Sequence, residues 1–271
     1  MRLLRTIVFL WVFFCITDTS YAKKDFIIIG STTSTENSGF YQHILPIVQK
    51  ETGIEIRVVA VGTGKALALA KRGDVDILIV HAKEDEEKFV NNGYGIRRKD
   101  LMFNEFFIVG PEEDPANIKN EKIIYNVLWK IHESAMKNSK IKFLSRGDES
   151  GTHKRELGIW KEAGIDPDEL KGKWYSEVGG GMGRTLMIAG ELGAYTLTDS
   201  ATWMNLKNKN GLRILYKNAK ELLNQYGIIL LTKDSKKQLT NQFFDWMTSS
   251  EGKKAIEDFK IRGNKAFFTE K

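Results

Sequence analysis

The chain of 271 residues has one cysteine, Cys15, and four histidines that lie far apart in the sequence. Without a second cysteine, neither a disulfide framework nor a cysteine-based zinc site can form. His43, His81, His132 and His153 lack the spacing of metal ligands, and the chain has no Gly-x-Ser-x-Gly motif. We interpret each histidine as a core or capping residue. The usual components of hydrolytic and metal-dependent enzymes are missing, so we expect a protein that is not an enzyme and has no cofactor.

The chain also lacks a cluster of charge of one sign. Its 41 Lys and Arg residues exceed its 35 Asp and Glu residues, which gives a formal net charge of +6, but segments such as "AKEDEEKF" mix both signs. A nucleic-acid-binding surface needs a continuous basic patch. We therefore expect no nucleic-acid partner. The weak positive field favours the capture of small anions.

No apolar run in the chain is long enough to cross a bilayer, which takes about 20 residues. The longest N-terminal run, 7–16, follows Arg2 and Arg5 and precedes the sequence Ser20-Tyr21-Ala22. A short apolar run with basic residues before it and a small-x-small site after it is typical of a secretory signal. We expect residues 1–22 to be a signal peptide that is cleaved after Ala22, and the exported protein to be soluble and periplasmic.

Short β-branched runs alternate with helical periodicity through the rest of the chain, and this pattern predicts an α/β fold with parallel sheets. The predicted strands include "FIIIG" (26–30), "EIRVVAV" (55–61), "DILIVHA" (76–82) and "IKFLS" (141–145). Two longer apolar strands, 101–115 and 225–232, could carry the chain out of one lobe and back into it. We expect two lobes with a ligand cleft between them. Lobe 1 would comprise 23–107 and the return segment 228–271, and lobe 2 would comprise 108–227.

In an open parallel sheet, the loops at the carboxyl ends of the strands face a common crevice where ligands bind. The loop "STTSTENS" (31–38) places Thr33 and Ser34 there, and "GTG" (62–64) places Thr63 between two glycines. Hydroxyls and main-chain amides at the start of a helix bind anions well. The alternative for the first loop is an ordinary Ser/Thr cap of a helix.

The segment "FLSRGDESGTH" (143–153) has the same arrangement and adds a permanent cation, Arg146. A guanidinium gives paired donors to a tetrahedral oxyanion. Ser150, Gly151 and Thr152 offer further donors at the start of a helix. We expect Asp148 to orient the arginine without contacting the ligand; the alternative is that Asp148 simply neutralises Arg146 in a turn. An adhesive role for the tripeptide "RGD" is a third interpretation.

The glycine-rich segment "GGGMGRTL" (179–186) precedes another predicted helix. It offers the amides near Met182 and a second cation, Arg184, although it lacks the spacing of a dinucleotide-binding fingerprint. A plain glycine connection explains the segment equally well.

Taken together, these loops resemble those of the tungstate-binding periplasmic proteins of ABC transporters. The resemblance depends on "STTS", "VAVGTGKAL", "DILIVHA", "SRGDESGTH" and "MGRTL", which occur in this order over most of the chain. Two positions depart from the family: Ser31 stands where threonine is more frequent, and Arg184 stands where a small residue is common, which leaves the direction of Arg184 open. The fold that the resemblance implies is the two-lobed periplasmic binding protein. Its anion contacts would fall on Thr33, Ser34, Thr63, Arg146, Ser150, Gly151, Thr152 and the amides near Met182.

The resemblance implies a receptor that closes around tungstate and delivers it to an inner-membrane ABC permease. Because tungstate has no proton to donate at neutral pH, its site should contain hydrogen-bond donors only. The alternatives are molybdate, sulfate or phosphate as ligand and, more distantly, a secreted enzyme that handles phosphate esters. We expect a monomer.

Overall fold

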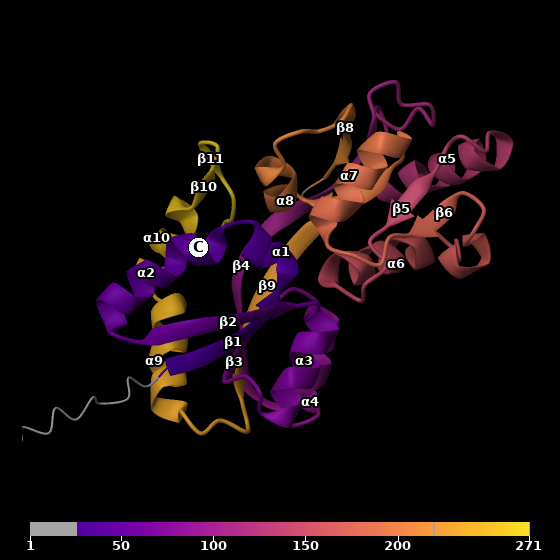
Figure 1. Cartoon of the computed structure of the whole chain (residues 1–271). Helices are drawn as coiled ribbons and strands as arrows, with labels where there is room; N and C mark the ends of the chain where they lie inside the picture. Colours follow the sequence, from indigo (N-terminus) through magenta and orange to yellow (C-terminus); the bar gives the residue numbers. More distant parts are fainter. Residues whose placement is uncertain (1–25, 219, 271) are drawn as a thin grey trace, which may run out of the picture.

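The computed structural model describes residues 26–218 and 220–270, which form two lobes connected by a pair of long strands (Figure 1). The predicted signal peptide, 1–22, lies outside the described residues. Within these two ranges, no helix is long and apolar enough to cross a membrane.

Lobe 1 contains both ends of the described chain. Its sheet has the strand order β2-β1-β3-β9-β4, in which β1 is parallel to β2 and β3 while β9 is antiparallel to β3. Its elements, apart from the two long strands, are β1 (Phe26–Thr32), α1 (Thr33–Asn37), α2 (Phe40–Thr52), β2 (Glu55–Val61), α3 (Thr63–Arg72), β3 (Ile77–Val80), α4 (Lys83–Asn91), α9 (Lys237–Met247), α10 (Ser250–Asp258), β10 (Lys260–Ile261) and β11 (Asn264–Lys265).

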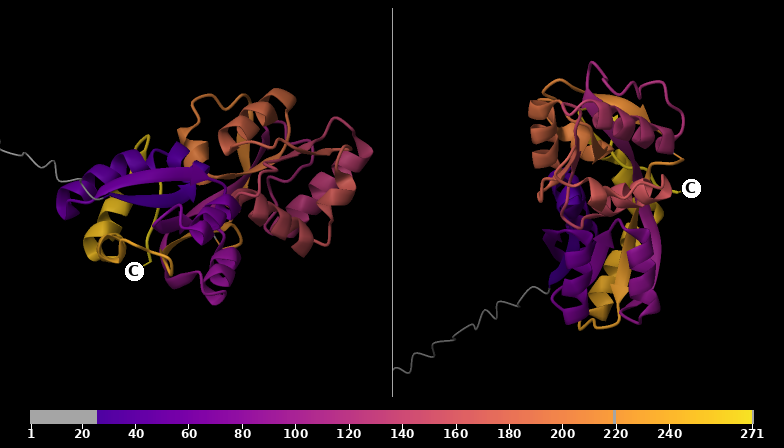
Figure 2. Two further views of the ribbon diagram at one scale, coloured as in Figure 1. Left: turned by 60° about the horizontal axis from the view of Figure 1, so that its bottom comes forward. Right: turned by 90° about the vertical axis from the view of Figure 1, so that its right-hand side faces the viewer.

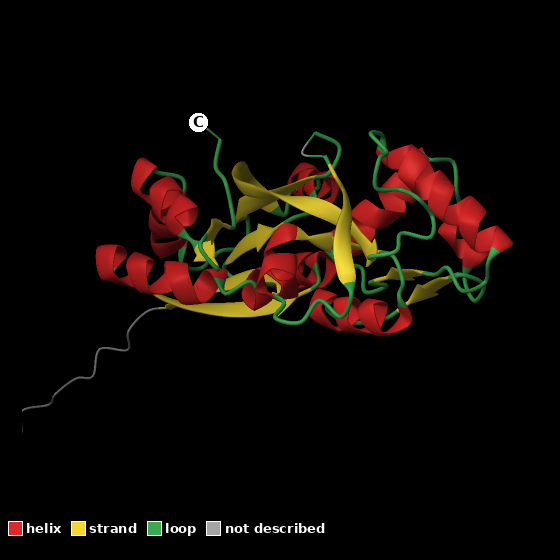
Figure 3. Cartoon of the chain, turned by 90° about the horizontal axis from the view of Figure 1, so that it is seen from above, coloured by secondary structure: helices red, strands yellow, loops and turns green. Residues whose placement is uncertain are grey.

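The connection between the lobes is an antiparallel pair of strands, β4 (Gly95–Pro111) and β9 (Leu223–Leu231). They pair from Gly95 and Leu231 at one end to Glu105 and Leu223 at the other. In the view from above, these strands run through the middle of the molecule from one group of helices to the other (Figure 3). Beyond Glu105, β4 continues into lobe 2, where it pairs with two other strands, β7 and β8.

Lobe 2 is built from the segment between the two crossings (Figure 2). Its parallel pair β5 and β6 lies next to β7 through a bridge between Phe143 and Tyr195. Its elements are α5 (Ile124–Lys137), β5 (Phe143–Ser145), α6 (Gly151–Glu162), the 3-10 helix η1 (Pro167–Leu170), β6 (Tyr175–Glu177), α7 (Met182–Leu192), β7 (Thr196–Asp199), α8 (Ser200–Asn205) and β8 (Leu212–Lys217).

Each lobe buries both faces of its sheet, because alternate residues of a strand point to opposite faces. In β3, Ile77 and Ile79 pack in the cluster that includes α2, α9 and α10, while Leu78 and Val80 pack in the cluster that includes α3 and α4. The clusters of lobe 2 run from Phe106 to Leu222 and use the faces of β4 and β5 in the same way. Helices on both faces explain why the predicted strands are continuously apolar.

Some predicted boundaries differ from those in the structure. Strand β4 begins at Gly95, before the predicted start at residue 101. The prediction missed this first part because its charged residues are partly exposed and it does not form an apolar run. The short helix α8 was not predicted.

Candidate functional site

Loops from both lobes meet where four helices begin: α1 and α3 in lobe 1, and α6 and α7 in lobe 2 (Figure 1). Each helix directly follows the loop at the end of a strand. The lobes are in contact here, since a Cβ atom added to Gly62 would lie 3.3 Å from the carbonyl oxygen of Asp148. The helix starts direct main-chain amides, and the positive ends of their dipoles, into the space between the lobes.

The first loop contributes a connected group of hydroxyls. Thr32 caps α1 by accepting from the amide of Thr35, which agrees with the capping alternative for this residue. Thr33 Oγ1 accepts a hydrogen bond from Arg146 Nη2 at 2.8 Å. Ser34 is 2% exposed, and its Oγ lies 3.1 Å from Thr32 Oγ1 and 3.2 Å from His81 Nε2. The loop therefore combines a helix cap with side chains that reach lobe 2 and β3.

Arg146 lies at the centre of the site. It is 1% exposed, although arginine is rarely buried unless it is paired. Its Nε donates to Asp148 Oδ2 at 2.9 Å, so one edge of the guanidinium is held by an acid of its own loop. Asp148 Oδ1 accepts from the amide of Ser150 at 3.2 Å. Asp148 thus orients the arginine and leaves its other nitrogens directed elsewhere.

Backbone geometry explains the tight turn of this loop. Gly147 has φ +63° and Glu149 has φ +56°, both in the left-handed region. A Cβ atom at residue 147 would lie 2.6 Å from Glu177 Cβ, so only glycine fits there. The turn brings Arg146 and the start of α6 to the same side.

The start of α6 places three predicted residues in different roles. Ser150 is the N-cap of α6, and its hydroxyl oxygen accepts a hydrogen bond from the amide of His153. The amide of Ser150 donates to Asp148. Ser150 therefore retains only its hydroxyl proton for a ligand. Gly151 packs against His81: a Cβ atom there would lie 2.5 Å from the carbonyl oxygen and 2.6 Å from Cε1 of that histidine. Thr152 is fully buried.

The glycine-rich segment is adjacent to Arg146 through its backbone. The amides of Gly179 and Gly180 donate to the carbonyl oxygen of Arg146 at 3.0 and 3.3 Å. Met182, the first residue of α7, is buried, whereas Arg184 is exposed. The structure therefore does not bring Arg184 to the other predicted contacts. The reason is helical periodicity, since residues 182, 185, 186 and 189 form the buried face of α7.

Nine buried side-chain atoms have no hydrogen-bond partner among the described residues, and three of them belong to predicted anion contacts at this junction: Thr63 Oγ1, Arg146 Nη1 and Thr152 Oγ1. We call these three the unpartnered donors. Thr63 belongs to lobe 1 and the other two to lobe 2. A buried polar group without a partner costs about 1–3 kcal/mol, so proteins rarely keep three in one place. Their number and their origin from both lobes indicate a binding site for an acceptor-rich ligand.

The nearest buried acid is engaged elsewhere. Asp199 is fully buried, and burial raises the pKa of its carboxyl group. Its Oδ1 and Oδ2 accept from the amide and hydroxyl of Thr202 at 2.8 and 2.7 Å, which caps α8. Both oxygens of Asp199 thus serve the start of a helix.

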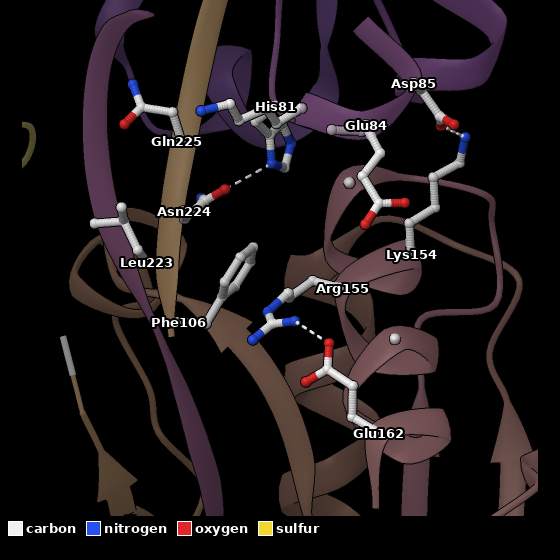
Figure 4. Close-up of a pocket in the computed structure, with 14 residues that line it drawn as sticks. His81, Glu84, Asp85, Phe106, Lys154, Arg155, Glu162, Leu223, Asn224 and Gln225 are labelled. Carbon is white, nitrogen blue, oxygen red and sulfur yellow. Dashed lines mark hydrogen bonds and ion pairs between the residues drawn. The ribbon is translucent and has the colours of Figure 1, made fainter. Parts of the chain in front are cut away.

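A space of about 360 Å³ lies between the lobes beside the contact between His81 and Gly151, and both residues line it. Figure 4 shows that its walls come from α4, α6 and the crossing strands, including Phe106. Two ion pairs lie along its walls: Lys154 with Asp85, which joins α6 to α4, and Arg155 with Glu162. This space contains none of the unpartnered donors.

Sequence reasoning missed the network around His81. His81 Nε2 lies near Ser34, and its Nδ1 lies 2.9 Å from Asn224 Oδ1 on β9. Asn224 in turn donates to Asn104 on β4. We expected His81 to be a core or capping residue, and nothing in the sequence connects residue 81 to residue 224.

Among residues 26–218 and 220–270, no group of three or more His, Cys, Asp or Glu side chains could hold a metal ion. The donors at the junction are hydroxyls, amides and a guanidinium, which suit an anion.

The sequence matches the model of the PBP superfamily domain over residues 17–251. The tungstate-binding protein TupA of Peptoclostridium acidaminophilum is 43% identical over 242 residues, which cover 87% of this chain and 82% of that protein. The chain belongs to the TupA family of this superfamily. TupA of Campylobacter jejuni is 34% identical over 243 residues and 87% of each chain. These matches confirm the predicted family.

Solved structures of TupA family members confirm the two-lobed fold. The crystal structure of the tungstate ABC transporter protein from Geobacter sulfurreducens has a TM-score of 0.75 and 43% identity, and the match covers 87% of this chain and 99% of that one. The tungstate-binding protein TupA from Desulfovibrio alaskensis has a TM-score of 0.75 and 41% identity, with coverage of 89% and 97%.

Proposed function

We propose that this TupA family member is the periplasmic receptor of an ABC importer, which binds tungstate between its lobes and delivers it to the permease. The observation that carries the proposal is the set of unpartnered donors, which both lobes contribute. An oxyanion supplies the acceptors that these donors need. Relatives named as tungstate-binding proteins support tungstate as the ligand.

Charge and burial favour tight binding of a small dianion. Arg146 supplies a permanent positive charge within a site that is closed to water by both lobes, where electrostatic attraction is stronger than in bulk solvent. Each hydrogen bond to a charged group contributes about 1.5–3 kcal/mol. The three unpartnered donors, the hydroxyl of Thr33 and nearby amides together could supply the ~12 kcal/mol of nanomolar affinity after the cost of ordering.

Two acids at the junction, Asp148 and Asp199, already have both carboxylate oxygens engaged, which favours an anion without a proton. Asp148 is occupied by Arg146 and Ser150, and Asp199 by Thr202. Hydrogenphosphate would direct its proton at a donor. Tungstate, molybdate and sulfate have no such proton at neutral pH, so the chemistry of the site separates phosphate from the other three anions more sharply than it separates those three.

Delivery to a permease requires that the loaded and empty receptor differ in shape. Several contacts exist only when the lobes meet: Arg146 with Thr33, Lys154 with Asp85, and Gly151 with His81. A ligand that bridges the lobes stabilises this arrangement by its preference for the closed state. We propose that the permease recognises the closed form, with the receptor acting as a monomer.

Native mass spectrometry of the purified protein tests the ligand directly, and a co-purified mass of tungstate is the expected result. Isothermal titration with tungstate, molybdate, sulfate and phosphate then ranks the anions. Phosphate binding more tightly than tungstate would refute the proposal, and turnover of a phosphomonoester would revive the enzyme alternative. Recovery of the processed chain from a periplasmic fraction tests the location.

A further inference from the structure

His81 occupies a special position between the proposed anion site and the crossing strands. It follows β3 directly and is 4% exposed. Its ring stacks on Tyr226 of β9, with centroids 4.7 Å apart and an angle of 22° between the planes. Gly151 of lobe 2 packs on the same histidine so closely that any side chain at residue 151 would collide with the ring. His81 therefore contacts lobe 2, the crossing strand and the first loop.

The hydrogen bonds around the ring determine which nitrogen carries the proton. Asn224 Nδ2 donates to Asn104 Oδ1 at 2.7 Å and to Tyr226 Oη at 3.2 Å. With the amide of Asn224 in this orientation, its oxygen faces His81 Nδ1 at 2.9 Å. An oxygen can only accept, so Nδ1 must donate. Burial lowers the pKa of His81 to about 4, which keeps the ring neutral at physiological pH.

A neutral ring with its proton on Nδ1 presents a lone pair at Nε2. Ser34 Oγ lies 3.2 Å from Nε2 and must therefore donate its single hydroxyl proton to the ring. This bond directs the proton of Ser34 away from the anion and fixes the loop that carries Thr33 next to Arg146. Ser34 then retains its main-chain amide for the ligand.

We propose that His81 is a positioning residue of the oxyanion site. Asn224 holds its ring in the Nδ1–H form, and the ring links the loop 32–34 to strand β9 by hydrogen bonds. The same ring provides the surface against which Gly151 of lobe 2 packs. This inference rests on the proposed function for its effect on binding, but not for the tautomer itself. His81 acts through Ser34 and Gly151, and it does not contact the ligand. It thereby connects the anion loop to the strands that cross between the lobes.

The tautomer is measurable without any ligand. The chain has four histidines, so long-range proton–nitrogen NMR spectra of protein labelled at histidine nitrogens resolve each ring. We expect His81 to show the Nδ1–H form, which is the minor tautomer of free histidine in water. In Asn224→Leu the acceptor is lost, and we expect the ring of His81 to shift to the Nε2–H form. An Nε2–H ring in the wild-type protein would overturn the proposal.

Binding provides the second measurement. Asn224→Leu and Ser34→Ala should each weaken tungstate binding by about tenfold, the usual effect of losing one buried hydrogen bond. Gln225→Leu is the matched control, because it removes an amide from the next residue of β9, whose bonds go to the carbonyl oxygens of Met102 and Tyr226. We expect this control to change both the tautomer and the affinity little.

A double-mutant cycle between Ser34→Ala and Asn224→Leu separates positioning from general damage to the fold. The ring of His81 directly bridges the side chains of Ser34 and Asn224, so the two losses of affinity should fail to add if His81 couples them. Additive losses would overturn the coupling. Thermal melts of both variants exclude unfolding as the cause. If the protein keeps the Nδ1–H tautomer but binds no tungstate, the proposed function fails and the tautomer assignment stands.

Discussion

Arg146 of lobe 2 donates a hydrogen bond from Nη2 to the hydroxyl of Thr33 in lobe 1, across 2.8 Å. The hydroxyl accepts through its oxygen, so its proton is still available to a bound anion. A single arginine thereby contacts the opposite lobe, its own orienting acid Asp148, and the space in which we place tungstate. The charge that attracts the ligand also holds the lobes together.

Arg146→Ala should weaken tungstate binding by at least about thirtyfold, because truncating a buried charged partner typically costs about 2–5 kcal/mol. The tungstate affinity of Arg146→Lys should lie between those of the wild-type protein and Arg146→Ala, since lysine keeps the charge but lacks the planar guanidinium group. Isothermal titration measures both. Arg184→Ala is the matched control: this arginine is exposed on α7, and its loss should change affinity less than about threefold.

Equal losses for Arg146→Ala and Arg184→Ala would contradict the placement of the anion beside Arg146. Melting of the ligand-free variants shows whether loss of the arginine has also disturbed Asp148 and Thr33, which it contacts.

Thr63→Val and Thr152→Val should affect binding and stability in opposite directions. Each removes an unpartnered hydroxyl with little change in volume, so the ligand-free protein should melt at the same temperature or higher. Tungstate affinity should fall about tenfold for each. Thr240→Val is a suitable control, since that buried hydroxyl donates to Asp234 and its loss should lower the melting temperature without changing affinity. Unchanged affinity in both site variants would place the anion elsewhere.

Lys154→Met should weaken tungstate binding by about two- to fivefold, mainly through faster dissociation. The lysine pairs with Asp85 across the lobes and so favours the closed form. The double variant Lys154→Asp, Asp85→Lys, which exchanges the two charges, should recover part of the lost tungstate affinity. Stopped-flow dissociation measures the effect, and Lys161→Met, an exposed position on the same helix, should leave the rate unchanged. If the double variant dissociates tungstate as fast as Lys154→Met, the ion pair does not stabilise the closed form.

Glu156→Gln should stabilise the protein at pH 8 and have less effect at pH 5. Burial raises the pKa of Glu156 to about 7 from an ordinary value of 4.5. Between these values the folded state binds more protons than the unfolded state, so stability falls as the pH rises. Glutamine does not ionise and keeps an acceptor for Tyr175 and Trp160. The gain should approach about 3 kcal/mol above pH 7. Thermal melts from pH 5 to 8 test this, and a gain that is the same at every pH would contradict it.

The sequence was sufficient for the features that depend on local pattern. Alternating strands and helices predicted the α/β lobes, because burial on both faces of a sheet makes strands continuously apolar. The hydroxyl-rich and glycine-containing loops predicted where the helices begin. The position of Arg146, after β5 and before α6, follows from the same pattern, and the resemblance to tungstate-binding proteins gave the family.

Features that depend on long-range pairing could not be predicted. Asn224 and Ser34 meet at His81 only because β9 returns between β3 and β4, and no spacing in the sequence encodes that register. The outward direction of Arg184 depends on the residue at which α7 begins. The use of Ser150 as a cap depends on the turn at Gly147 and Glu149.

The position of β9 also determines the order in which the lobes can fold. This strand lies between β3 and β4 in the sheet of lobe 1, yet it is made after every residue of the lobe 2 core, which runs from Phe106 to Leu222. A chain growing from its N-terminus therefore lacks a central strand of the first lobe's sheet until residue 231 has been added, and the core helices α9 and α10 follow later still, whereas the second lobe is already complete in sequence. We expect the lobe that is synthesised later to acquire its native packing earlier.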